Sequence, residues 1–218
     1  MGQGRGPVTK TVSPSLLAAT TDTLRRMGPR RFSLTAVAEA AAVSRGTVHN
    51  ALGSRDQAIK IALDHLASAF IDAMAAEIDG ADTLAEKVCA AAVLICAHRR
   101  NSDSVAPGSI NEGIVVLLLR NIGDDLMRRA IELWKPLVRV AQRTGEVGAD
   151  LDAARASEWI VRILLSFELL PPIGVNLDSP RSVQRFVGDH IVAGLSGTQS
   201  THARLQRSDP GLHNGRTT

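Results

Sequence analysis

The apolar residues of this chain recur at every third or fourth position, and that spacing constrains the fold more than any other feature. In residues 59–78 it persists for more than five turns, at Ile59, Leu63, Leu66, Phe70, Met74 and Ile78. Such a period is typical of an α-helix. No segment alternates apolar and polar residues between hairpin signals. The sequence therefore predicts an all-α fold without a sheet.

Turn-forming residues divide the other periodic segments. We expect about nine helices, over residues 14–27, 34–41, 45–52, 54–78, 82–100, 108–120, 122–144, 152–170 and 180–195. Ser33, Ser44 and Ser54 each stand where a hydroxyl can cap the next helix, and Ser54 and Gln57 have the spacing of a capping box.

Basic residues are concentrated in the N-terminal quarter of the chain. Residues 1–60 contain nine Lys and Arg against three Asp and Glu, whereas residues 61–218 contain sixteen against nineteen. A local basic surplus beside a compact helical motif is typical of binding to a polyanion, most often nucleic acid. Ordinary solvated charge would give the same count, so the surplus alone leaves both interpretations open.

Residues 34–52 are the compact motif. Two short helices meet at a turn flanked by alanines at positions 38 and 40–42, which let the helices approach closely. This is the pattern of a helix-turn-helix, whose second helix can enter the major groove. Spacing alone leaves an αα-hairpin within a helical bundle as the alternative. The outward residues of the second helix are Arg45, Gly46, Thr47, His49 and Asn50.

Those side chains have the chemistry that DNA recognition needs. Arginine and asparagine make paired hydrogen bonds to the edges of guanine and adenine, and threonine can bond phosphate or pack on a thymine methyl group. Glycine permits close approach of the backbone. The motif therefore predicts a DNA-reading helix over residues 45–52.

The run FSLTAVAEAAAVSRGTVHNALGSRDQAIKIAL, residues 32–63, resembles the DNA-binding domain of the tetracycline-repressor (TetR) family of bacterial regulators. The resemblance is good over residues 14–62. It implies that Ser33 and Thr35 approach phosphate, and that Arg45, Thr47, His49 and Asn50 face the groove. It also implies that Arg55 grips the DNA backbone where the family usually has lysine.

The chain departs from the family pattern within the same motif. His49 replaces the usual tyrosine, Ala51 removes a further aromatic or histidine contact, and Leu52 replaces a core phenylalanine. Ala42 stands where the turn often has glycine. Alanine there costs about 1 kcal/mol of stability if the position requires a positive φ. These changes affect the operator sequence and affinity more than the fold.

The helical layout after residue 59 is similar to the family's second domain, and GEVGADLDAARASEWIVRILLSF, residues 145–167, is similar to many members. The resemblance implies an effector site and a four-helix dimer interface. Candidate effector residues are Phe70, Met74, Trp134 and Leu137, each of which could equally be core. Candidate dimer residues are Ile160, Ile163, Phe167, Val183, Phe186 and Val187, which could instead fill the core of one protomer.

These interpretations divide the chain into a flexible basic arm over 1–13, a helix-turn-helix domain over 14–58, an effector-binding and dimerisation domain over 59–196, and a disordered tail over 197–218. We expect a homodimeric, ligand-responsive regulator, by family default a repressor, that binds a palindromic double-stranded operator and is released by a small apolar effector. The alternative is a small-molecule-binding helical dimer whose DNA-reading surface has degenerated.

Other classes of function find little support in the residues. No nucleophile stands in a recognisable catalytic motif, the histidines and cysteines lack zinc-ligand spacing, and we expect no cofactor. Apolar runs such as residues 114–119 are far shorter than the roughly 20 residues that span a bilayer. We therefore expect a protein of the bacterial cytoplasm, associated with the nucleoid when bound to DNA. Cys89 and Cys96 are expected to be reduced and buried.

Overall fold

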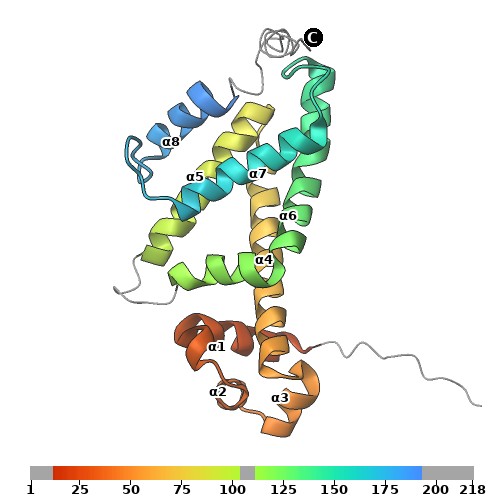
Figure 1. Ribbon diagram of the computed structural model, residues 1–218, viewed down its shortest axis with the longest axis vertical. Coiled ribbons are helices and arrows are strands. Elements are labelled where there is room, and N and C mark those ends of the chain that lie inside the picture. Colours follow the sequence, from red (N-terminus) through yellow and green to blue (C-terminus); the bar gives the residue numbers. More distant parts are fainter. Residues whose placement is uncertain (1–11, 104–110, 193–218) are drawn as a thin grey trace, which may run out of the picture.

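The computed structural model describes residues 12–103 and 111–192. These residues form α-helices and one short π-helix, and no strand occurs among them, which confirms the all-α prediction (Figure 1). The elements are α1 (Pro14–Arg31), α2 (Leu34–Ala40), α3 (Arg45–Leu52), α4 (Arg55–Asp79), α5 (Leu84–Asp103), α6 (Asn111–Thr144), α7 (Ala153–Leu169), α8 (Pro180–Phe186) and the π-helix η1 (Val187–Val192). Nearly all of the predicted N-terminal arm, and the predicted tail, lie outside the described residues.

The helices gather around two hydrophobic clusters that are joined by the long helix α4. Helices α1, α2 and α3 form a small unit at the lower end of Figure 1, and α4 runs from it up among α5, α6 and α7. The N-terminal cluster extends along α4 as far as Leu63, and the C-terminal cluster begins at Met74. The separation of the two cores supports a small N-terminal domain followed by a larger one, and the exact boundary at residue 58 stays a prediction.

The predicted helix starts in the N-terminal unit are confirmed by their caps. The hydroxyls of Ser33, Ser44 and Ser54 accept hydrogen bonds from backbone N–H groups three residues later. Gln57 completes the capping box, because its side chain accepts from the backbone N–H of Ser54 at 2.8 Å. Each cap satisfies a donor that the first turn of a helix otherwise leaves unpaired.

Helix α6 is interrupted at the break predicted between helices over 108–120 and 122–144. Ile122 has non-helical backbone angles there, with φ of −137° and ψ of 20°, so α6 consists of two helical segments joined at a kink (Figure 1). Before the kink, Leu117 and Leu118 pack against the N-terminal cluster. After it, Trp134 and Val138 are buried in the C-terminal cluster. Helix α6 therefore contacts both cores, which the sequence periodicity does not reveal.

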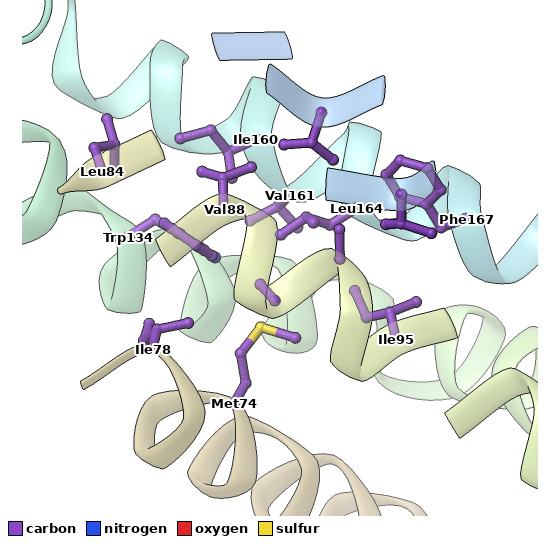
Figure 2. Close-up of a cluster of buried hydrophobic side chains, with 14 of the residues drawn as sticks. Met74, Ile78, Leu84, Val88, Ile95, Trp134, Ile160, Val161, Leu164 and Phe167 are labelled. Atoms are coloured by element: carbon purple, nitrogen blue, oxygen red, sulfur yellow. The ribbon is translucent and has the colours of Figure 1, made fainter. Parts of the chain in front are cut away.

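The C-terminal cluster contains most of the residues predicted for the dimer interface. Ile160 and Val183 are 0% exposed, Val187 is 0% and Phe167 is 5%. Figure 2 shows Ile160 and Phe167 of α7 pointing into this cluster together with Trp134. The prediction that these four residues contact a partner is wrong, because their side chains fill the core of their own protomer. Only Ile163 and Phe186 of the predicted set retain appreciable accessible surface.

A carboxylate joins the turn after α6 to the start of α5. Both oxygens of Glu146 accept backbone hydrogen bonds, from Leu84 N at 2.9 Å and from Ala85 N at 2.8 Å. Beside it, the ammonium of Lys87 donates to the carbonyl of Ile78 at 2.7 Å and to that of Ala81. The negative charge lies at the positive end of the α5 dipole. These contacts fix the turn between α4 and α5.

Candidate DNA-reading surface and effector cavity

Helix α3 presents one buried and one exposed face. Val48 and Leu52 are 0% and 2% exposed and belong to the N-terminal cluster. Arg45, Gly46, Thr47, His49 and Asn50 are all exposed. The structure thus brings together on one surface the five α3 residues predicted to face DNA.

The bounds of α3 follow from local chemistry. Ser44 Oγ accepts from Thr47 N at 3.0 Å and lies 2.9 Å from Thr47 Oγ1. The helix ends at Gly53, where φ is 72° and an added Cβ would lie 2.1 Å from Gln57 Oε1. Glycine is required there because a side chain would both strain the backbone and clash with the capping box. The exposed face of α3 is therefore held at both ends.

The turn between α2 and α3 contains Ala42, the residue that stands where the TetR family often has glycine. Ala42 has a φ of 53°, the only positive value at a described residue other than glycine. A left-handed backbone brings Cβ too close to the neighbouring carbonyl, so the position favours glycine. The positive φ that makes alanine less favourable than glycine at this position is therefore present, and Ala42 carries the cost of about 1 kcal/mol.

Ser33 and Thr35 lie at the start of α2, half-buried. Ser33 Oγ accepts from Ala36 N at 3.1 Å. A hydroxyl that accepts one bond keeps its own proton for donation. Ser33 can therefore cap α2 and donate to a phosphate at the same time, although its role at DNA stays a prediction.

Arg55 has protein partners that the sequence did not indicate. Its Nε donates to the carbonyl of Phe32 at 3.0 Å, and its Nη2 donates to the carbonyl of Pro29. Its Nη1 lies 3.3 Å from a carboxylate oxygen of Asp56. The guanidinium thus ties the start of α4 to the end of α1. Because a guanidinium has five N–H donors, this tie leaves donors for a phosphate, and that contact stays a prediction.

A cavity of about 740 Å³ lies in the larger unit, between helices α4, α5, α6 and α7, and reaches α1. Phe70, Met74 and Trp134 line it, and their role at an effector site stays a prediction. Leu137 does not: it lines a separate cavity of about 480 Å³ beside Lys87 and Glu146. The prediction for Leu137 is wrong because this residue lies roughly 4.5 Å further along α6 than Trp134, past the end of the larger cavity.

Four polar side chains line the larger cavity, and sequence reasoning placed none of them there. His98 and Glu168 face each other, with 3.7 Å between Nδ1 and Oε2, and the ring of His98 packs edge-on against Phe70 at 5.3 Å. Arg25 and Arg26 of α1 are exposed and therefore lie at the rim. No local motif marks these residues, since they come from helices far apart in the chain.

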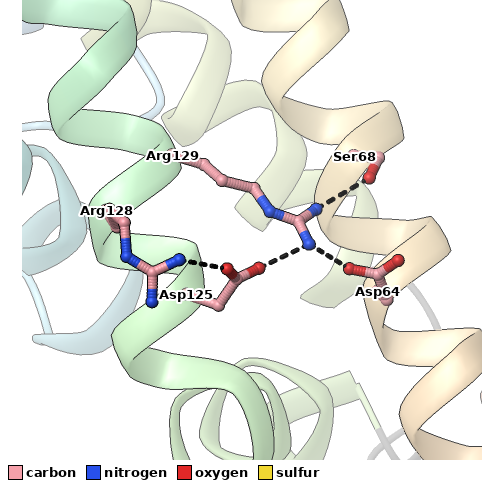
Figure 3. A network of polar contacts seen from close by, with 5 residues as sticks. All are labelled: Asp64, Ser68, Asp125, Arg128 and Arg129. Carbon is pink, nitrogen blue, oxygen red and sulfur yellow. Dashed lines mark hydrogen bonds and ion pairs between the residues drawn. The ribbon is translucent and has the colours of Figure 1, made fainter.

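A polar cluster joins α4 to α6 near the same cavity (Figure 3). Arg129 of α6 donates to Ser68 Oγ at 3.0 Å and pairs with Asp64 of α4 and with Asp125. Asp125 also pairs with Arg128 at 2.7 Å. The hydrogen bond that Arg129 donates to Asp64 raises the pKa of Arg129 above its ordinary value. Met127 and Ala130, adjacent to these residues on α6, line the cavity.

The chain resembles solved structures over most of its length. One is the TetR-family repressor AlkX from Dietzia sp., at 24% identity and a TM-score of 0.54, covering 84% of this chain and 95% of that one. Another is the TetR-family regulator CifR in complex with a 26-base-pair operator duplex, at 20% identity and a TM-score of 0.59, covering 87% and 99%. This chain has the TetR-family fold.

A third structure with this fold is FadR from Bacillus subtilis in complex with stearoyl-CoA, at 12% identity and a TM-score of 0.54, covering 85% of this chain and 98% of that one. No protein-family model matches the sequence, and no curated protein matches it either. The TetR-family fold thus rests on the arrangement of the helices, together with the resemblance of the N-terminal motif.

Two other properties bear on function. Within residues 12–103 and 111–192, no group of three or more His, Cys, Asp or Glu side chains is arranged to hold a metal ion. No helix in the same ranges is long and apolar enough to cross a membrane.

Proposed function

We propose that this protein is a homodimeric transcriptional regulator that reads a palindromic operator through α3 and is released from it by a small, largely apolar effector. The observation that carries the proposal is the exposed face of α3, where Arg45, Thr47, His49 and Asn50 lie together on a helix anchored by Val48 and Leu52. The TetR-family fold supports it, and the operator complex of CifR is a similar chain bound to DNA. Such a regulator acts as a repressor in the bacterial cytoplasm, on the nucleoid.

The DNA contacts divide into two kinds. Arg45 and Asn50 reach base edges, since their side chains can form paired hydrogen bonds to guanine and adenine. Ser33, Thr35, Thr47 and Arg55 bind phosphates, which position the protein on the duplex but carry no sequence information. Gly46 allows the α3 backbone close to the groove, and His49 supplies a smaller contact than the tyrosine usual in the family.

Dimerisation is proposed through the α7–α8 face. Ile163 and Phe186 retain surface there, and Leu170 beyond the end of α7 is 60% exposed. A twofold pair would place two α3 helices about 34–36 Å apart, the length of one turn of DNA. Light scattering tests this interface: Phe186→Glu should give a monomer, whereas Val140→Glu, at an apolar residue of α6 that is 45% exposed, should leave the dimer intact. A dimer with Phe186→Glu would place the interface elsewhere.

Effector control is proposed to act through α4 and α6. Both helices line the cavity, both pack on the N-terminal cluster, and Arg129 ties them together. A ligand that binds better to one spacing of the two α3 helices than to the other shifts the population toward that spacing. Movement of α4 would then reach α3 directly, because α4 follows α3 after Gly53.

The test is selection of DNA from a random duplex library with the purified full-length chain, followed by a salt titration of the selected sequence. A palindrome is expected, with a log–log slope against salt that reports the number of neutralised phosphates. Thr47→Ala should weaken binding severalfold with helix content and dimerisation unchanged. Weak binding that is blind to sequence would instead favour the alternative, a ligand-binding helical dimer that has lost operator recognition.

A further inference from the structure

The ionisable side chains that line the larger cavity differ in whether they have a charged partner. Every lining side chain other than Arg25, Arg26, His98 and Glu168 is apolar or aromatic. His98 and Glu168 face each other. In contrast, neither Arg25 nor Arg26 forms an ion pair with any residue of the described ranges. Arg26 Nε donates only a long bond, 3.4 Å, to the backbone carbonyl of Asp22.

We propose that the effector is an anionic amphiphile: its acidic head is bound by Arg25 and Arg26 at the rim, and its apolar body fills the cavity. This inference rests on the effector role proposed above and specifies the chemistry of the ligand. The head is a carboxylate or a phosphate, since a guanidinium binds both through paired hydrogen bonds. The body is aliphatic or aromatic.

The apolar side chains that line the cavity exclude an orientation in which the acidic head of the ligand lies inside it. An anion placed among the apolar side chains would lose its hydration without compensation. At the rim it keeps contact with water and gains two cations. An apolar body gains about 25 cal/mol for each Å² that leaves water, and a volume of about 740 Å³ is within the range of sites for drug-sized ligands.

The position of the two arginines links the ligand to the DNA-binding unit. Arg25 and Arg26 belong to α1, whose Leu16 and Leu24 pack in the same cluster as Val48 and Leu52 of α3. The apolar body meanwhile contacts α4, α5, α6 and α7. One bound molecule therefore touches both units, and the head group acts on the orientation of α1 relative to the larger unit.

The experiment measures binding of three probes with the same ten-carbon chain: decanoate, decyl phosphate and 1-decanol. Trp134 lines the cavity and the chain has two tryptophans, so full-length protein carrying Trp159→Phe reports on Trp134 alone by fluorescence. Titration calorimetry provides an independent dissociation constant. At least one anionic probe should bind about tenfold or more tightly than decanol, and the tighter of the two identifies the head group.

The variants Arg25→Gln and Arg26→Gln, combined in one chain, should weaken binding of that anion at least tenfold and change decanol binding less than twofold. Arg30→Gln with Arg31→Gln is the matched control, since it removes the same charge from the exposed last turn of α1, away from the cavity. The inference is overturned if decanol binds as tightly as both anions, if all three probes fail to bind, or if the control pair weakens the anion equally.

The same samples separate this inference from the proposed function. Binding to the selected duplex is measured with and without the anionic probe. If the anion binds through Arg25 and Arg26 but leaves DNA affinity unchanged, the ligand chemistry stands and the proposed role of the ligand as effector fails. If decanol alone binds and releases the DNA, the effector role stands and the anionic head is excluded.

Discussion

The substitution Gly46→Ala should separate the stability of the protein from its affinity for DNA. Gly46 is the second residue of α3 and is exposed. An added Cβ would meet only Ser44 Oγ, at 3.6 Å, an ordinary van der Waals distance. The fold therefore has no need of glycine at this position. Since glycine in a helix is less favourable than alanine, the variant should gain about 0.5–1 kcal/mol of stability.

Binding to DNA should change in the opposite direction. A methyl group on the outward face of α3 holds the helix back from the groove, and a shift that breaks one paired contact to a base costs about 1–3 kcal/mol. At about 1.4 kcal/mol per factor of ten, affinity for the selected duplex should fall about tenfold or more. Urea unfolding measures the first effect and fluorescence anisotropy with labelled duplex measures the second.

Gly123→Ala is the matched control. Gly123 lies in α6, and its added Cβ would meet nothing within 4 Å. This variant should be stabilised to a similar degree with no change in DNA affinity. If Gly46→Ala is stabilised but binds the duplex as tightly as the unaltered chain, Gly46 is not at the DNA surface and the placement of α3 in the groove is refuted.

Ala42→Gly should stabilise the protein by about 0.5–1 kcal/mol, because the relief of strain at the positive φ exceeds the entropy that glycine adds to the unfolded chain. Ala40→Gly, at the end of α2, should destabilise the protein by a similar amount. If urea unfolding shows that both variants change the free energy of unfolding in the same direction, the strain at Ala42 is contradicted. Glu146→Gln removes the charge and one acceptor from the start of α5 and should lower stability by about 2 kcal/mol, and an unchanged urea midpoint would show that the cap contributes nothing. Burial raises the pKa of the Cys89 and Cys96 thiols above the ordinary 9.0, so alkylation by iodoacetamide should be slower at pH 7 than for a free thiol and should accelerate only above pH 9. The stability that these neutral thiols contribute is present below pH 9 and is lost as the pH rises through their folded values. Cys96 is buried, whereas Cys89 is only half-buried, so rapid labelling of Cys96 in the folded protein at pH 7 would contradict its burial.

The parts of this fold that depend on neighbouring residues could be predicted from the sequence. The caps at Ser33, Ser44 and Ser54 involve hydroxyls and amides three residues apart, so the residue types and their spacing suffice. The exposed face of α3 follows likewise from the positions of Val48 and Leu52 in the helical period. The cost at Ala42 could be anticipated only from the resemblance, because the TetR family often has glycine at this position of the turn.

The parts that depend on packing between distant segments could not be predicted. An apolar stripe on α7 looks the same in sequence whether it faces a partner or its own core, which is why the sequence cannot separate an interface role for Ile160 and Phe167 from a core role. The end of the cavity along α6 depends on how α6 sits against α4 and α5, and Leu137 falls beyond it. Arg25 reaches the rim only because α1 packs beneath the larger unit.

The measurement that tests the central claim most directly is the base preference of Asn50→Ala. Anisotropy titrations compare the unaltered chain and the variant on the selected palindrome and on duplexes with single base-pair changes. We predict that the variant binds the palindrome more weakly and loses discrimination at one base pair in each half-site, because the paired bonds from Asn50 to adenine are gone. If the variant keeps the full base preference of the unaltered chain, Asn50 does not read the operator and α3 is not the recognition helix in the orientation proposed.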